Sequence, residues 1–174
     1  YAVDGHFALG GTYVGSLGDS AVTVGFGYSQ TEGAMTGANQ MTNDEGGVHL
    51  GISAVTGDLT VAVGFADGDS IESSTSAAGT DVQSDGEYVA AGAKYVSGDL
   101  TFNVGFASGT SKDSTTIGTA GTTEDSLDKV SASVSYAVAS GVTAYLGYSD
   151  SDAEDEGAAS TDGSAWYIGA NMSF

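Results

Sequence analysis

Apolar residues alternate with small or polar residues along most of the chain, and four segments share one design. Each has apolar residues at every second position, Thr at the second position, Gly at the sixth and an aromatic residue at the seventh. These segments are residues 22–28, 59–65, 100–106 and 142–148. A period of two residues is typical of a β-strand with one apolar face.

Five further segments alternate in the same way, so the sequence predicts nine strands. Their alternate rows are Phe7, Leu9, Gly11, Tyr13; Val48, Leu50, Ile52, Ala54; Val89, Ala91, Ala93, Tyr95; Val130, Ala132, Val134, Tyr136; and Trp166, Ile168, Ala170, Met172, Phe174. The chain has 28 Gly and no Pro, which disfavours helices and keeps every backbone donor available for strand pairing.

The connections between these strands alternate between short and long. Short Gly-containing turns are expected at residues 18–19, 56–58, 97–99 and 139–141, and long polar loops at residues 29–46, 67–86, 108–126 and 149–164. Outer-membrane barrels show this asymmetry, with short periplasmic turns and long external loops. The pattern places the last strand's end on the short-turn side and Asp4 and His6 on the long-loop side.

Aromatic residues mark both ends of the apolar rows. Tyr28, Phe65, Phe106 and Tyr148 come just before long connections, whereas Tyr13, Tyr95, Tyr136 and Phe174 fall at the opposite level. Two such levels are expected at the two interfaces of a bilayer. No apolar run approaches the roughly 20 residues that a membrane helix needs. The predicted strands therefore form part of a transmembrane β-barrel wall.

Charge narrows the possible partners. The chain has 23 acidic residues against three Lys and no Arg, a net charge of −20, and 18 of the acids, counting Glu87, fall in the predicted long loops. A chain with so few cations cannot displace the counterions of a phosphate backbone, so nucleic acid is excluded as a partner. There is no Cys and hence no disulfide framework.

Nine strands do not form a complete barrel of the usual kind, which has an even strand number. An open edge in hydrocarbon would also leave backbone groups unsatisfied. We therefore predict that residues 1–174 form one all-β domain, an antiparallel barrel segment whose upstream strands are missing from the sequence or supplied by another chain. The recurrence of a hairpin about every 40 residues also suggests a propeller, but a propeller blade needs four strands in that span and the sequence predicts two. A calcium-binding solenoid is a second alternative, but its nonapeptide Gly/Asp repeat is absent.

The face opposite the apolar rows is rich in Gly, Ala, Ser and Thr, with Tyr88 and Asn171 among its few larger members. Small side chains in a wide barrel leave an aqueous passage, whereas a small closed barrel needs a filled interior. The candidate pore-lining residues on this face are Lys94, Lys129, His49, Asn103, Tyr145 and Tyr167.

The sequence offers residues for two kinds of site chemistry, metal binding and hydrolysis. Asp150, Asp152, Glu154 and Glu156 offer alternating oxygen ligands for a weakly bound Ca²⁺, but the run lacks the Gly and terminal Glu of an EF-hand loop. The acidic run is also what a solvated loop would show. His6 and His49 belong to no hydrolase motif, so we predict that the protein is not an enzyme.

Three segments resemble a known family. The pattern Tyr167-x-Gly169-x-x-Met172-x-Phe174 is similar to the assembly signal of outer-membrane barrels, and residues 1–13 and 97–109 resemble the later strands of alphaproteobacterial general porins. The resemblance implies the C-terminal portion of a sixteen-stranded, homotrimeric porin without a cofactor. Its implied partners are the lipid bilayer, lipopolysaccharide, the barrel-assembly machinery and small hydrophilic solutes.

The same resemblance implies a constriction loop upstream of Tyr1. The family's basic cluster opposite that loop has no counterpart among three Lys and no Arg. Long external loops that carry most of the 23 acids would create a negative potential at the pore mouth. For this reason we predict a passive, cation-preferring diffusion channel in the bacterial outer membrane. The alternative is a small outer-membrane barrel that acts as a structural anchor or adhesin through acidic external loops.

Overall fold

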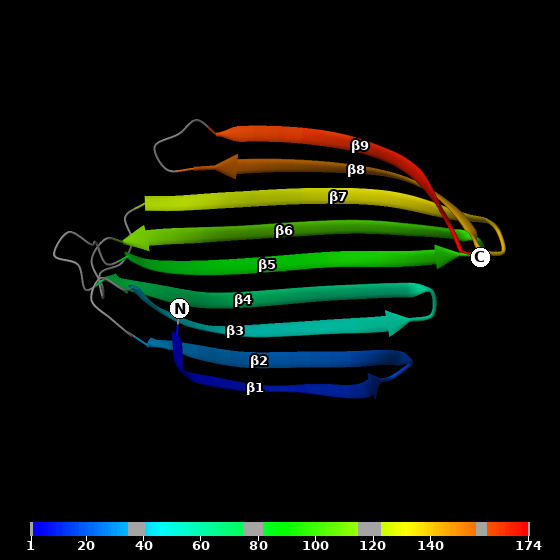
Figure 1. Cartoon of the computed structure of the whole chain (residues 1–174). Coiled ribbons are helices and arrows are strands. Elements are labelled where there is room, and N and C mark those ends of the chain that lie inside the picture. The colour runs from blue at the N-terminus through cyan, green and yellow to red at the C-terminus, as the bar shows by residue number, and fades with distance from the viewer. Residues whose placement is uncertain (1, 35–40, 75–81, 115–122, 156–159, 174) are drawn as a thin grey trace.

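The fold is one continuous antiparallel β-sheet. The computed structural model describes residues 2–34, 41–74, 82–114, 123–155 and 160–173. Nine strands follow one another in chain order, and each strand pairs with the next (Figure 1). Their bounds are β1 Ala2–Leu17, β2 Ser20–Ala34, β3 Met41–Thr56, β4 Leu59–Ser74, β5 Val82–Ser97, β6 Leu100–Ser114, β7 Thr123–Ala139, β8 Val142–Glu154 and β9 Thr161–Met172.

The four short connections are two-residue hairpin turns. Gly18, Gly57, Gly98 and Gly141 have φ of 60°, 57°, 58° and 75°, a left-handed conformation that Gly adopts without steric cost. Tight hairpins of this length need a positive φ in the turn. The predicted positions of the short turns are confirmed, and they lie together at one end of the sheet with the end of β9 (Figure 1).

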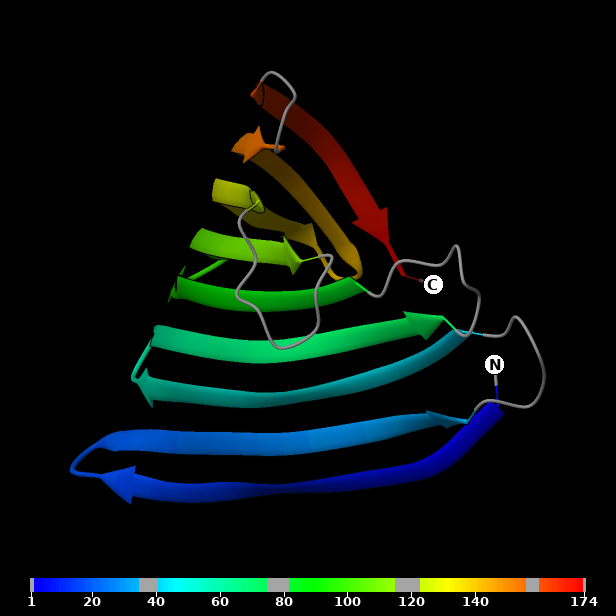
Figure 2. The same ribbon diagram turned by 90° about the vertical axis from the view of Figure 1, so that its left-hand side faces the viewer.

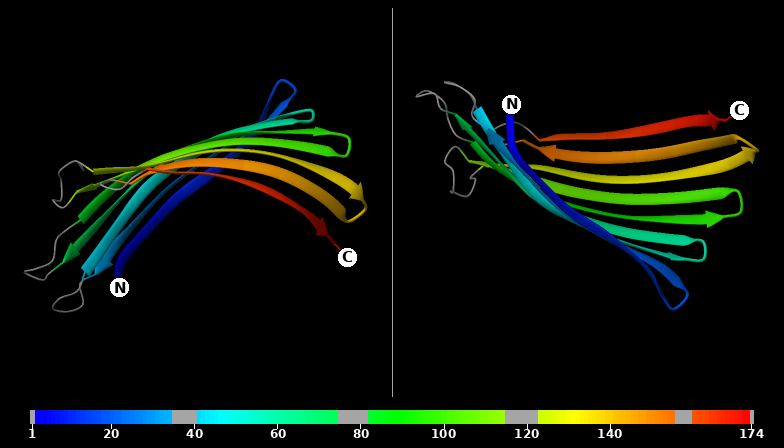
Figure 3. Two further views of the ribbon diagram at one scale, coloured as in Figure 1. Left: turned by 90° about the horizontal axis from the view of Figure 1, so that it is seen from above. Right: turned by 60° about the horizontal axis from the view of Figure 1, so that its bottom comes forward.

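The sheet is open and curved. Figure 2 shows the twist that separates the direction of β1 from that of β9, and Figure 3 shows the strands bent into an arch. β1 pairs only with β2, and β9 pairs only with β8, so each has one edge without a partner strand in the described sheet. The prediction of nine antiparallel strands is confirmed, and the open, curved sheet has the form expected of a segment of a barrel wall.

The described part of the chain has no hydrophobic core. It is a single layer in which no apolar side chain is buried, and Ile168 and Trp166 on β9 are 84% and 72% exposed. Within the same residues, no helix has the length and apolarity needed to cross a membrane. The apolar side chains of this sheet must therefore be covered by something other than the described chain.

One prediction about the long connections is wrong. Their polar composition predicts loops of up to 20 residues, but both flanking strands continue into them. For example, β4 runs to Ser74 and β5 starts at Val82. Of the 18 acids assigned to these loops, 15 lie within strands and Asp155 directly follows β8, while Asp81 and Glu156 are outside the described residues. Paired backbone hydrogen bonds across each hairpin hold these polar segments extended, which composition alone does not indicate.

Candidate functional site

Register divides the side chains of the sheet between two faces. Residues directly opposite one another in paired strands point to the same side. The predicted apolar rows meet across every pair, for example Leu50 with Phe65 and Phe106 with Val130. We call this side the apolar face, and the side that carries the alternate residues, including Thr60, Gly92 and Gly105, the small-residue face.

All six predicted pore-lining residues lie on the small-residue face. Lys94 stands opposite Thr60 on β4 and Asn103 on β6, and Asn103 stands opposite Ser133 on β7. The same register continues to the others, with His49 opposite Ala66, Lys129 opposite Ala107, Tyr145 opposite Ser135 and Tyr167 opposite Gly147. The sheet thus gathers them on one surface, although they come from six strands.

The two lysines of this face do not form a basic cluster. Lys94 pairs with Asn103, and Asn103 pairs with Ser133 on β7. Ser133 is four residues along β7 from Lys129, so the two lysines are offset by four residues along the strand direction. That offset corresponds to roughly 13 Å along the strand. The Asn103 side chain donates from Nδ2 to Ser133 Oγ at 3.3 Å, which fixes one of the few polar groups between them.

The small-residue face is hollowed over β1 to β5. A shallow hollow of about 570 Å³ is lined chiefly by small side chains of this face, including Thr23, Gly25, Gly51, Ala62 and Gly64. Large side chains would fill this hollow, but the small-residue-face positions that line it carry Gly, Ala, Ser and Thr, with His49 as the exception. The face can therefore border open space rather than pack against a core.

Aromatic residues of the apolar face fall at two levels. At the level next to the long connections, Tyr148 packs on Trp166 with ring centroids 4.8 Å apart, and Phe7 lies 6.2 Å from Tyr28. Tyr95 and Tyr136 sit opposite Leu59 and Leu100 beside the short turns. Phe174 is outside the described residues. Between the two levels the face is chiefly aliphatic, with Phe26 opposite Gly11 and Phe102 opposite Tyr95 as further aromatic residues, as in a wall that crosses hydrocarbon.

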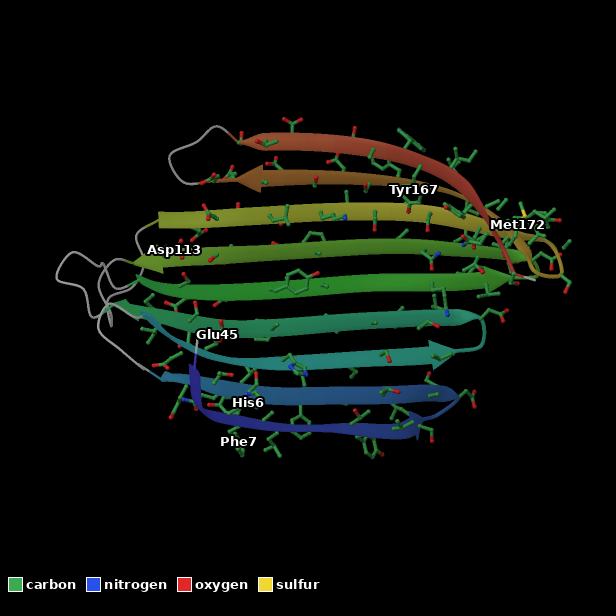
Figure 4. The ribbon with its side chains drawn as sticks, viewed as in Figure 1. His6, Phe7, Glu45, Asp113, Tyr167 and Met172 are labelled. Carbon is green, nitrogen blue, oxygen red and sulfur yellow. The ribbon has the colours of Figure 1, made fainter. Side chains whose placement is uncertain are left out.

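The carboxylates are distributed unequally between the faces. Some acids lie between the long connections and the aromatic level next to them. On the small-residue face, those with described side chains are Glu45, Asp113 and Asp125. Ser84 Oγ donates a hydrogen bond to Asp113 Oδ1 at 2.6 Å. Figure 4 shows Glu45 and Asp113 at the long-connection end of the sheet, whereas Met172 lies at the other end. The apolar-face side of the same strand extensions carries Glu32, Asp44, Asp67, Asp69, Asp85, Glu87, Glu124, Asp128, Asp150, Asp152, Glu154 and Asp162.

Sequence reasoning missed this separation because it treated the acidic segments as loops. Strand parity could have found it, since Asp67 and Asp69 continue the row of Phe65. Lys112 also lies on the apolar-face side of these strand extensions, where its Nζ forms an ion pair with Glu124 Oε2 at 3.0 Å.

The predicted calcium ligands do not converge in the described structure. Asp150, Asp152 and Glu154 lie along β8 instead of in a loop, and Glu156 is outside the described residues. Successive residues on one side of a strand are spaced by roughly 7 Å. Tyr148 donates to Asp150 at 3.0 Å. No group of three or more metal-ligating side chains occurs among the described residues, and calcium binding stays a prediction.

The assembly motif lies on β9, and it is split between the faces. Tyr167 and Gly169 belong to the small-residue face, opposite Gly147 and Tyr145, whereas Met172 belongs to the apolar face opposite Val142. The two tyrosine rings are 6.3 Å apart across the β8–β9 pair. The motif residues that the structure describes are thus part of the wall itself.

A curved single-layer sheet with an apolar outer face, two aromatic levels and a small-residue inner face is the wall of an outer-membrane β-barrel. Comparison with known families agrees: residues 1–156 match the family described as Gram-negative porin. The chain belongs to this family, which places it in the outer membrane of Gram-negative bacteria. Family membership also supports the prediction that the protein is not an enzyme. No match was found among curated proteins.

Solved structures of the OmpT outer-membrane protein of Vibrio cholerae have a similar fold. The outer-membrane-expressed form superposes with a TM-score of 0.57 at 17% identity, covering 96% of this chain and 56% of OmpT. A trimer form folded in vitro superposes with a TM-score of 0.55 at 16% identity, covering 94% of this chain and 56% of OmpT. A variant lacking loop L8 superposes with a TM-score of 0.57 at 16% identity, covering 92% of this chain and 51% of the variant. The chain therefore spans about half the length of these structures.

Proposed function

We propose that this chain forms part of the wall of a water-filled channel through which small hydrophilic solutes and ions diffuse passively. The observation that supports this function is the continuous small-residue face, which crosses all nine strands behind a lipid-compatible apolar face. Lys94, Lys129, His49, Asn103, Tyr145 and Tyr167 would line the lumen. We expect solutes to be selected by size and charge.

Channel formation is tested directly with the intact protein in a planar lipid bilayer. We expect discrete conductance steps that keep rising with KCl concentration at high salt, as for diffusion through water, without saturation at a binding site. An intact, correctly inserted protein that gives no conductance steps would contradict the proposal.

The alternative is a small barrel that anchors acidic segments at the cell surface. Such a barrel would need bulky or charged residues to fill its interior. Gly25, Gly51 and Gly64 instead lie side by side across β2, β3 and β4 on the small-residue face. The number of strands in the intact protein distinguishes the two functions, because a small closed barrel requires few strands beyond the nine described.

We propose a homotrimer as the functional assembly. The suggestion comes from OmpT, whose structure is described as a trimer form, and from the family resemblance. Chemical cross-linking in isolated outer membranes should give a ladder that ends at three subunits. A ladder that ends at one subunit would contradict the trimer and leave the channel proposal standing.

The motif at Tyr167, Gly169, Met172 and Phe174 is proposed to direct insertion by the barrel-assembly machinery. We expect Phe174→Ser to reduce the amount of heat-modifiable barrel in the outer membrane, because the motif loses its terminal aromatic residue. Any protein that does insert should conduct normally. A normal yield of the variant would contradict the role of Phe174, and Ser173→Ala is the matched control.

A further inference from the structure

Four ring side chains of the small-residue face stand directly opposite glycines of a paired strand. His49 faces Gly27, Tyr88 faces Gly109, Tyr145 faces Gly169 and Tyr167 faces Gly147. Three strand pairs carry these four oppositions, and β8 and β9 exchange two of them. Every large ring among the predicted lumen residues is therefore matched by a glycine.

The rings lie over these glycines instead of standing away from the sheet. A methyl group on Gly109 would lie 3.3 Å from Cδ2 of Tyr88. A methyl group on Gly27, Gly147 or Gly169 would overlap ring atoms of His49, Tyr167 or Tyr145, respectively. The space that a Cβ would need is occupied by the ring in each of these three cases.

Burial supports the same arrangement. Gly27 and Gly147 are the only residues of the described chain that are buried, although the sheet is a single layer. At each of them the three atoms nearest to the missing Cβ position belong to the opposing ring. Figure 4 shows Tyr167 on β9 beside the neighbouring strand β8.

The consequence for a channel is steric. Side chains in strands normally stand roughly perpendicular to the sheet, so a tyrosine on this face would project into the lumen. A glycine opposite the ring lets it lie across the wall, where it also covers exposed backbone, as in aromatic rescue of glycine. The ring then takes up little of the open cross-section.

We propose that Gly27, Gly109, Gly147 and Gly169 are ring seats, which hold His49, Tyr88, Tyr167 and Tyr145 against the wall and thereby set the size limit for solutes. The inference rests on the proposed channel function and deepens it. It assigns the size limit in this part of the wall to the glycines opposite the rings as well as to the ring residues. Filling a seat with a methyl group displaces the ring toward the lumen.

The test compares two glycine substitutions in the intact protein in planar bilayers. Gly147→Ala should lower the single-channel conductance and the size of the largest neutral polymer that enters the channel. Gly64→Ala should change neither, because its new methyl group would lie 3.8 Å from the nearest atom, the Leu50 carbonyl oxygen, with no ring opposite. Both variants add one methyl group to the same face.

A double variant separates a displaced ring from a general disturbance of the wall. Adding Tyr167→Ser to Gly147→Ala removes the ring and should restore conductance and the polymer limit to wild-type values or above. Tyr167 also belongs to the proposed assembly motif, but single-channel conductance is measured per inserted channel. Tyr167→Ser alone should leave that conductance at or above the wild-type value, because removing the ring can only widen the open cross-section. If Gly147→Ala does not insert, Gly109→Ala beneath Tyr88 provides the same comparison at a less crowded seat.

The outcomes distinguish the inference from the function on which it rests. A conducting wild type with Gly147→Ala or Gly109→Ala indistinguishable from Gly64→Ala would overturn the ring seats and leave the channel intact. A reduced conductance that Tyr167→Ser fails to rescue would overturn them as well. A wild type that does not conduct would overturn the channel proposal itself, and the ring seats with it.

Discussion

Val104→Arg is expected to destabilise the barrel by about 2 to 4 kcal/mol, the cost of a cation on the lipid face near the bilayer midplane. Val104 lies on the apolar face of β6, opposite Ala93 and Ala132, and is 57% exposed in the described sheet. Lipid would cover this exposed surface. Urea titration of protein folded into lipid vesicles, followed by heat-modifiable mobility in gels, measures the loss.

The matched control is Thr101→Arg on the same strand. Thr101 stands opposite Val96 and Ser135 on the small-residue face, where a guanidinium stays in water. Its cost in unfolding free energy should be small. Equal destabilisation by the two substitutions would show that the assignment of the faces is wrong.

Cation preference is the second large effect that we expect. The intact protein should give a cation-selective reversal potential under a KCl gradient at low salt, because carboxylates dominate the long-connection end of the sheet. Their influence extends over about a Debye length, roughly 10 Å at 0.1 M salt. The preference should fade as salt rises, and an anion-selective reversal potential at low salt would refute it.

The distribution of acids between the faces refines this experiment. Neutralising Glu45, Asp113 and Asp125 together removes charge from the small-residue face, which would border the lumen. Neutralising Asp67, Asp69 and Glu87 removes an equal number of carboxylates from the apolar-face side. We expect the first triple variant to lose more selectivity. A larger loss from the second would place the effective field outside the channel.

The two lysines of the small-residue face provide an opposite test of sign. Lys94→Gln and Lys129→Gln each remove a positive charge from the face that carries Asn103 and Ser151. Each should increase cation preference at low salt, with the effects close to additive because the two amines are far apart. A decrease in preference would mean that these amines do not border the permeation path.

The sequence was sufficient to predict the strands and their faces, because the apolar alternation from residues 22–28 to the terminal strand has no competing helical period. The turns followed from Gly18, Gly57, Gly98 and Gly141, whose positive φ few other residues adopt. Opposed rows such as Phe65 with Val89 then put the candidate pore residues on one face. Local pattern and hairpin register agree throughout this part of the wall.

The strand extensions and the ring seats were not predicted. Segments such as residues 67–74 are polar and rich in Ser and Asp, so composition favours a loop, whereas pairing with β3 and β5 keeps them extended. The ring seats depend on which residues are directly opposite across strands. Tyr167 and Gly147 are 20 positions apart, and a shift of one residue in register would separate them.

The central claim is that the small-residue face borders water and the apolar face borders lipid, and cysteine labelling tests it most directly. The chain has no Cys, so single cysteines at residues 101 to 104 of β6 would report individually. A charged, membrane-impermeant thiol reagent should label Thr101→Cys and Asn103→Cys and reduce their conductance, while Phe102→Cys and Val104→Cys remain unlabelled. Labelling of Phe102→Cys and Val104→Cys, with Thr101→Cys and Asn103→Cys protected, would contradict the account.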